Sequence, residues 1–176
     1  LGKTSGPRIR DVEIDYSQKW IPKILGSIES NYGRSPHYSY FADVIESAIK
    51  KKPITLHELN IELIFRISQE LELDTKIEVS SQIETSSDPN QRLIDLTRHA
   101  NCDQYLSGQA AHHYLDIERF SENKIKVLWY EFDEMSRYPQ QSSQFLSKLS
   151  IIDLLMNLGS IQTGRFLTEV NRTKGI

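Results

Sequence analysis

Two adjacent histidines, His112 and His113, are the residues of this sequence best suited to proton transfer. An imidazole titrates near neutrality, so general base catalysis is the chemistry that they suggest. Neighbouring residues of a helix point about 100° apart, so one small site can use only one of them. We take His113 as the candidate, with Asp133 as a second candidate base. The alternative, that both histidines are ordinary surface residues, stays open, and no third ligand at helical spacing indicates a metal site.

Polar residues follow each of the three strands that we predict. They are Ser80-Ser81, Ser107-Gly108 and Asp133-Glu134. Ligands of open parallel sheets bind beyond the carboxyl ends of the strands. Gly108 would also let a ligand approach the backbone N–H groups. These residues therefore predict a polar pocket at one edge of the sheet, although Ser, Gly and Asp are also the usual residues of loops.

The single cysteine, Cys102, gives little support to nucleophilic catalysis. It has no CxxC partner and no basic neighbour closer than His99, so we expect a buried, inert thiol. One cysteine excludes an intrachain disulfide and a multi-cysteine zinc site, and it fits a reducing, cytoplasmic location. No nucleotide-binding glycine motif or nucleophile elbow occurs, and we expect no cofactor.

The composition is that of one globular domain. The chain has 176 residues, 38% of them hydrophobic, with 21 Lys and Arg against 24 Asp and Glu and a net charge of −3. This balance argues against a dedicated nucleic-acid binder. No apolar run approaches the roughly 20 residues that cross a bilayer, so we expect no membrane insertion. The oligomeric state is left open.

The first part of the chain, residues 8–75, is predicted to be helical. Apolar residues recur at three- and four-residue spacing from Trp20 to Tyr32, which indicates one helix. Ser35-Pro36 predicts the start of a second helix. The sequence Thr55-Leu-His-Glu58 is a capping box at the start of a third.

The second part, residues 76–170, alternates strands and helices. We predict strands at 76–81, 104–107 and 124–132, and helices at 88–99, 110–123 with a break near Asp116, 150–159 and 160–170. This order predicts an α/β fold, a small parallel Rossmann-like sheet flanked by helices, with an N-terminal helical half. We expect one domain, 1–176. The chain opens without methionine, so we expect a trimmed chain whose front segment would complete the thin sheet.

Several segments, in this order and at these gaps, resemble the WbqC-like protein family. They are Trp20 with Ile28 and the run Tyr32-Gly-Arg-Ser-Pro-His-Tyr38; Leu56 with Asn60; Tyr105-Leu-Ser-Gly108 with Tyr114-Leu115 and Phe120; Trp129-Tyr-Glu-Phe132 with Tyr138-Pro-Gln140; and Phe145 to Asn157. The resemblance covers most of residues 20–159. Family members begin with a strand and a Gln-Pro-x-Tyr-x-Pro-like loop that this chain lacks. The family's His-Pro pair before Tyr138 is absent too.

The resemblance implies a place among bacterial proteins encoded with polysaccharide and O-antigen biosynthesis genes, for which glycine transfer has been suggested. Matched residues that fit a substrate site are Tyr105, Ser107, Gly108, Gln140, Asp153 and Asn157. Asp153 and Asn157 lie four residues apart, on one helix face. However, Asp153 also completes a Ser150-Ile-Ile-Asp153 capping box, so a structural role is an equal alternative.

Three functions remain open. The first is a transferase that moves an acyl or aminoacyl group, such as glycyl, onto a sugar. The second is a non-catalytic module that binds nucleotide sugars or carbohydrates. The third is a protein-interaction domain that uses the helical half. The first two predict a small-molecule partner, an activated sugar or an acyl donor.

Overall fold

A computed structural model describes residues 6–130 and 136–173 of the chain, with side chains as far as Val170. The chain divides into two compact units, Leu1–Asp74 with Glu134–Ile176, and Thr75–Asp133. The first boundary falls where the sequence predicts the change from helical to α/β structure. The C-terminal segment belongs to the helical unit, whereas the sequence assigned it to the α/β part. The structure is a mixed α/β fold, as predicted.

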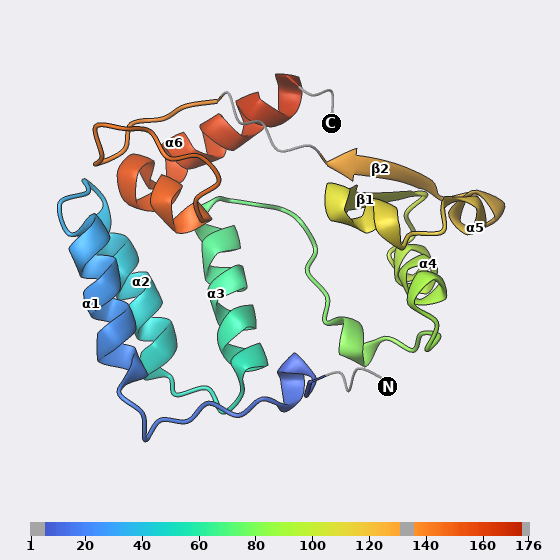
Figure 1. Cartoon of the computed structure of the whole chain (residues 1–176), viewed down its shortest axis with the longest axis horizontal. Coiled ribbons are helices and arrows are strands. Elements are labelled where there is room, and N and C mark those ends of the chain that lie inside the picture. The colour runs from blue at the N-terminus through green and yellow to red at the C-terminus, as the bar shows by residue number, and fades with distance from the viewer. Residues whose placement is uncertain (1–5, 131–135, 174–176) are drawn as a thin grey trace. The chain divides into compact units, whose positions relative to one another are not determined.

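The helical unit is built on four α-helices: α1 (Trp20–Tyr32), α2 (Tyr38–Lys50), α3 (Leu56–Glu70) and α6 (Ile151–Thr173). Figure 1 shows α1, α2 and α3 side by side, and α2 also packs against α6. Their shared core consists of Phe41, Ile45, Ala48, Ile49, Leu59, Leu155 and Met156. A helix that presents an apolar stripe must bury it against another element, so the predicted stripes account for this arrangement.

The helix ends confirm some of the sequence signals and correct one. The Thr55 capping box forms: its hydroxyl accepts from the backbone N–H of Glu58, whose carboxylate accepts from the N–H of Thr55. The second helix begins at Tyr38 rather than at Ser35-Pro36, which occupy the preceding turn. The N–H of Ser35 donates to the carbonyl of Tyr32, so this turn continues directly from the end of α1.

Helix α6 is broken at Gly159, as the predicted pair 150–159 and 160–170 requires. Gly159 has φ 73° and ψ 173°, a conformation that other residues rarely adopt. A Cβ atom at this position would lie 2.8 Å from Cε1 of His37, so the imidazole occupies the space that a side chain would fill. Glycine is therefore required by the backbone angle and by the packing of His37.

The second unit contains a two-stranded parallel sheet, β1 (Gln104–Gly108) and β2 (Lys126–Tyr130), with α4 (Pro89–His99) and α5 (Ile117–Glu122). Its core is formed by Ile94, Leu115, Phe120 and Ile125. The predicted break near Asp116 is confirmed: η3 (Gln109–His113), a short 3₁₀ helix, precedes it, and Asp116 caps α5 by accepting from the N–H of Arg119. Residues 131 and 132 of the third predicted strand lie outside the described residues.

The strand predicted at 76–81 is wrong. The described residues 76–79 have no regular structure, and η2 (Ser80–Gln82) is a 3₁₀ turn. Ile77 and Val79 are half-buried and alternate with exposed Lys76 and Glu78, whose side chains pair at 2.8 Å. The alternation thus reflects an extended segment with one covered face. A strand also needs a hydrogen-bonded neighbour, and alternation alone does not supply one.

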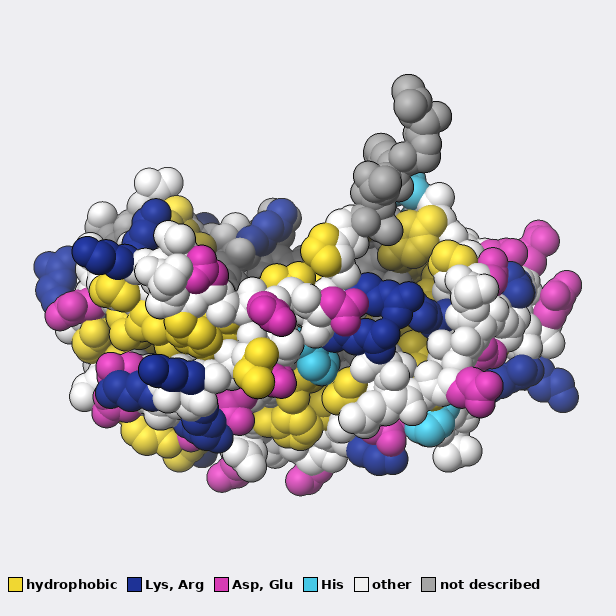
Figure 2. All heavy atoms as spheres, turned by 90° about the horizontal axis from the view of Figure 1, so that it is seen from below, with side chains coloured by type: hydrophobic (Ala, Val, Ile, Leu, Met, Phe, Trp, Pro, Cys, Tyr) yellow, Lys and Arg dark blue, Asp and Glu magenta, His cyan; other side chains and the backbone are white. Residues whose placement is uncertain are grey.

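Charged side chains of both signs share the surface. Figure 2 shows Lys and Arg together with Asp and Glu on the face that it displays, with apolar side chains between them. The largest exposed fractions among bulky apolar residues are 71% at Ile161 and 67% at Ile54. In the part of the chain that the structure describes, no helix combines the length and the apolar character needed to cross a membrane.

Candidate functional site

The structure separates the predicted site residues into two groups. Tyr105, Ser107, Gly108 and His113 belong to the unit with the sheet, and Gln140, Asp153 and Asn157 belong to the helical unit. Asp133 lies outside the described residues.

The carboxyl ends of β1 and β2 lie side by side. Ser107 is in register with Trp129, and Gly108 with Tyr130. Ser107 is buried and Trp129 is half-buried. Among the described residues other than its two chain neighbours, no atom lies within 4 Å of the place where a Cβ of Gly108 would be, so the described structure leaves space beside the backbone at this point. This edge is where ligands of open parallel sheets bind.

A histidine stacks on this sheet end. The ring of His112 lies over Trp129 with the centroids 3.5 Å apart and the planes 18° from parallel. Nε2 of His112 is 3.1 Å from Oε1 of Gln109. The amide nitrogen of Gln109 in turn makes a long hydrogen bond, 3.5 Å, to the carbonyl of Tyr130. Stacking and hydrogen bonding together fix the orientation of an otherwise exposed imidazole.

The contacts of Gln109 assign the tautomer of His112. Because the Gln109 amide nitrogen donates to a carbonyl, its oxygen must face Nε2 of His112 as an acceptor. In the neutral form of the ring, this arrangement puts the hydrogen on Nε2 and leaves the lone pair on Nδ1. A neutral imidazole that is oriented through one nitrogen and free at the other has the form of a general base.

Two residues that the sequence predicted for this site, His113 and Tyr105, have surroundings that differ from those of His112. His113 is exposed at the end of η3. Tyr105 is half-buried, with its ring 5.3 Å from that of Phe120, and it packs against the core of the unit. Sequence reasoning singled out the histidine pair but not Gln109. The only sequence signal for Gln109 was its place directly after Gly108, at the end of a predicted strand.

The second group forms a buried hydrogen-bond network at the start of α6. The Asp153 carboxylate, 4% exposed, accepts from the hydroxyl of Tyr138 at 2.7 Å and from the amide of Gln140 at 3.1 Å. The Tyr138 ring meets those of Phe145 and Phe166 edge-on. Burial and the hydrogen bond to the Asp153 carboxylate raise the pKa of Tyr138 far above its usual value.

Both polar atoms of the Gln140 side chain are engaged in this network. Its amide nitrogen also donates to the hydroxyl of Tyr138 and to the carbonyl of Leu146, and its oxygen accepts from the N–H of Leu146. The Asn157 amide donates to the carbonyl of Asp153 and accepts from the hydroxyl of Ser35. These residues therefore tie the loop 138–146 and the end of α1 to α6. A substrate role for Gln140, Asp153 and Asn157 stays a prediction.

This network also corrects the capping box expected at Ser150. The Ser150 hydroxyl accepts a long hydrogen bond, 3.4 Å, from the N–H of Ile152. The backbone N–H of Asp153 donates to the carbonyl of Ser150, while the carboxylate points to Tyr138 and Gln140 instead. The spacing of Ser150 and Asp153 fits a capping box, but the Asp153 carboxylate accepts instead from Tyr138, which lies 15 residues upstream.

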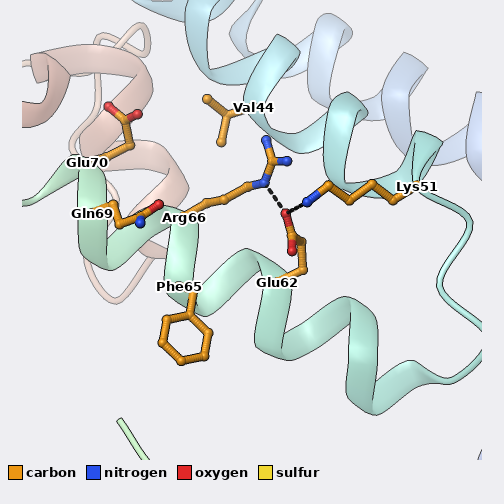
Figure 3. Close-up of a pocket in the computed structure, with 7 residues that line it drawn as sticks. All are labelled: Val44, Lys51, Glu62, Phe65, Arg66, Gln69 and Glu70. Atoms are coloured by element: carbon orange, nitrogen blue, oxygen red, sulfur yellow. Dashed lines mark hydrogen bonds and ion pairs between the residues drawn. The ribbon is translucent and has the colours of Figure 1, made fainter. Parts of the chain in front are cut away.

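A pocket of about 440 Å³ lies between α2 and α3 (Figure 3). Within it, Lys51 and Arg66 both point to Glu62, and Arg66 also donates to the hydroxyl of Ser47 at 2.6 Å. The hydrogen bonds from Lys51 and then Arg66 hold the pKa of Glu62 below its ordinary value. The two cations are thus already paired with protein partners.

Metal binding and the reactivity of the single cysteine are two further questions of chemistry. Among the described residues, no group of three or more His, Cys, Asp and Glu side chains is arranged to hold a metal ion. Cys102 is exposed, which corrects the expectation of a buried thiol. It follows the end of α4, where the backbone N–H of Cys102 donates to the carbonyl of Thr97 and the side chain is left at the surface.

Comparison with known proteins places the chain in a family. The sequence matches the model of the WbqC-like protein family over residues 2–164, so the chain belongs to this family and the resemblance seen in its motifs is confirmed. It is also 30% identical over 154 residues to the uncharacterized protein Rv1507c of Mycobacterium tuberculosis (strain ATCC 25618 / H37Rv). The match covers 87% of this chain and 66% of that protein, so the chain spans just under two thirds of its relative's length. No solved structure matches.

Proposed function

We propose that this protein is a transferase that moves an acyl or aminoacyl group, such as glycyl, onto a sugar during assembly of a bacterial surface polysaccharide. The observation that carries the proposal is the His112 imidazole at the carboxyl end of the sheet, held by Gln109 and Trp129, with no partner for Nδ1 among the described residues. The family resemblance supports the polysaccharide context and the choice of glycine. The small-molecule partners and the cytoplasmic location stay part of the proposal.

The chemistry needs a base and a donor for the developing oxyanion. A sugar amine or hydroxyl attacks the carbonyl carbon of the activated acyl group, and its proton passes to Nδ1 of His112. The bond to the leaving group then breaks, and His112 returns the proton to that group. The backbone N–H groups near Ser107 and Gly108 are the candidate oxyanion donors. His113 and Asp133 remain alternative bases.

A second candidate is a non-catalytic module that binds nucleotide sugars or carbohydrates at the same place. It is favoured by the half-buried Trp129 ring at the sheet end, because aromatic faces give sugars a flat apolar platform. This function needs no base. The two candidates therefore differ in what they require of His112.

The test compares turnover in matched variants. The protein is incubated with a panel of nucleotide sugars and activated glycyl or acyl donors, and the acylated sugar is detected by mass spectrometry. His112→Phe keeps a ring to stack on Trp129 but removes the base, so we expect turnover to fall by about 10²–10⁴-fold. His99→Phe, at an exposed histidine of the same unit, is the control and should leave turnover unchanged.

The other outcomes separate the candidates. A larger loss in His113→Phe than in His112→Phe would move the base to His113 and contradict the assignment of His112. Saturable binding of a nucleotide sugar without any product, equal in wild type and His112→Phe, would favour the binding module. Neither binding nor product with any member of the panel would reject both small-molecule functions.

A further inference from the structure

A second pocket of the helical unit lies around the break in α6. It has a volume of about 510 Å³ and is lined by residues of α2, of α6 and of the turn before α2: His37, Tyr40, Phe41, Leu158, Gly159, Ser160, Ile161, Gln162 and Arg165. Small-molecule sites have volumes of about 300–1,000 Å³. The glycine at the break shapes this pocket, because the His37 ring occupies the place of a missing side chain.

The charges of this pocket differ from those of the pocket in Figure 3. No acidic residue is among the residues that line it, whereas Glu62 and Glu70 both line the other. Lys51 and Arg66 are held there by Glu62. Arg165, in contrast, has no ion pair or hydrogen bond within the described part of the chain. Its guanidinium is available to an anionic ligand.

The carboxylate of Glu70 contacts two residues that line this pocket. Both oxygens of Glu70 accept hydrogen bonds from lining residues, one from the hydroxyl of Tyr40 at 2.7 Å and one from the hydroxyl of Ser160 at 3.0 Å. Glu70 itself is among the residues that line the neighbouring pocket. The contact with Glu70 also fixes the Tyr40 ring, because its hydroxyl is held in place.

The pocket also offers exposed apolar surface. Tyr40 is 55% and Ile161 is 71% exposed, and both line it, above the buried Phe41. Exposed aromatic and branched side chains next to an unpaired arginine fit a ligand with a flat apolar part and an anionic part. His37 and Gln162 add hydrogen-bonding groups.

We propose that this pocket binds a small molecule that carries a phosphate group beside an aromatic body, such as a nucleoside phosphate, with Arg165 on the phosphate and Tyr40 and Ile161 against the base. This inference does not depend on the proposed transfer reaction, because its residues belong to the other unit of the chain.

The experiment is a titration of the isotope-labelled chain followed by NMR, with UMP, uridine and inorganic phosphate as the probes. We expect UMP to give saturable shifts at the amides of Ser160 and Arg165 and at the ring of Tyr40, at lower concentrations than either of its parts. Arg165→Gln should weaken UMP binding at least tenfold and leave uridine binding unchanged. Lys51→Gln removes the same charge from the neighbouring pocket and should leave UMP binding unchanged.

Three results would overturn the proposal. The first is the absence of saturable shifts at these residues. The second is equal weakening by Arg165→Gln and Lys51→Gln, because it would mean that only the overall charge of the surface attracts UMP. The third is equal affinity for UMP and inorganic phosphate, which would mean that the aromatic body contributes nothing to binding.

Discussion

The polar side chains at the start of α6 and those at the end of the sheet differ in how far their hydrogen-bonding atoms are satisfied. In the helical unit, Asp153 and Gln140 are surrounded by partners, and both polar atoms of the Gln140 side chain are already hydrogen-bonded. At the sheet end, His112 is exposed and is held through one nitrogen, and the described residues offer the other nitrogen no partner. Polar side chains that satisfy one another stabilise a fold, whereas a polar atom that is oriented but unsatisfied can act on a ligand. The comparison predicts different effects of mutation in the two groups.

Removing the centre of the satisfied network should have the largest effect. Asp153→Ala leaves the Tyr138 hydroxyl and the Gln140 amide without their shared acceptor in a buried site, so we expect the free energy of unfolding to fall by roughly 2–3 kcal/mol. The two tryptophans, Trp20 and Trp129, belong to different units. Urea unfolding followed by Trp20 fluorescence in a Trp129→Phe background therefore reports on the helical unit.

A control on the same unit makes this measurement specific. Asp43 is an exposed carboxylate of α2, and Asp43→Ala should change the free energy of unfolding by less than about 0.5 kcal/mol. Equal effects at Asp43 and Asp153 would contradict the view that the network locks α6 in place.

Tyr138→Phe should have an intermediate effect, with a characteristic dependence on pH. The variant loses the hydrogen bond from the hydroxyl to Asp153 and the one that the hydroxyl accepts from Gln140, but the cost should be only about 1 kcal/mol, because Gln140 still donates to Asp153 and to the carbonyl of Leu146. The raised pKa of Tyr138 means that the folded state favours the neutral phenol. The stability gained from this is complete below the usual tyrosine pKa of 10.0 and is lost as the pH rises above it.

The measurement compares wild type with Tyr138→Phe from neutral pH to well above pH 10, a range set by the usual tyrosine pKa of about 10. Other tyrosines of this unit, Tyr32, Tyr38 and Tyr40, also have raised pKa values, so the difference between the two proteins is the informative quantity. We expect the stability gap to shrink as the pH rises. A gap that does not change with pH would mean that the Tyr138 hydroxyl is not held as the structure has it.

His112→Phe should have the smallest effect on stability. The ring is exposed, and phenylalanine can still stack on Trp129, so we expect a change of less than about 0.5 kcal/mol in the unfolding of the second unit. Trp129 fluorescence in a Trp20→Phe background reports on this unit. A loss comparable to that of Asp153→Ala would place His112 among the structural residues and remove the contrast between the two groups.

The sequence predicted local structure better than it predicted partners. The helices from Trp20 and from Thr55, the break near Asp116 and the interruption at Gly159 depend on nearest neighbours, and they are confirmed. The strand expected at 76–81 failed because strand pairing depends on residues elsewhere in the chain. The Ser150 capping box failed for the same reason, since Tyr138 and Gln140 engage the carboxylate of Asp153.

The prediction of the candidate site from the sequence had the same limit, because it found residues by local pattern but not their distant partners. The sequence located the pair His112-His113 and the strand end at Ser107-Gly108, because residue type and local pattern carry that information. From the pair it chose His113, which stays a prediction. The reason to consider His112 is its stacking against Trp129 and the contact between Gln109 and Tyr130, 21 residues apart, and a local pattern does not reveal such contacts.

The glycine break in α6 has a consequence for how the protein can change over evolution. In an unbroken helix each inserted residue turns everything beyond it by about 100°, so the two ends must keep a common phase. The left-handed backbone at Gly159 removes that constraint. The segment that carries Asp153 and the segment that carries Arg165 do not form one continuous helix. Natural variation in the second segment can therefore reshape the surface around Arg165 while the Asp153 network stays as it is.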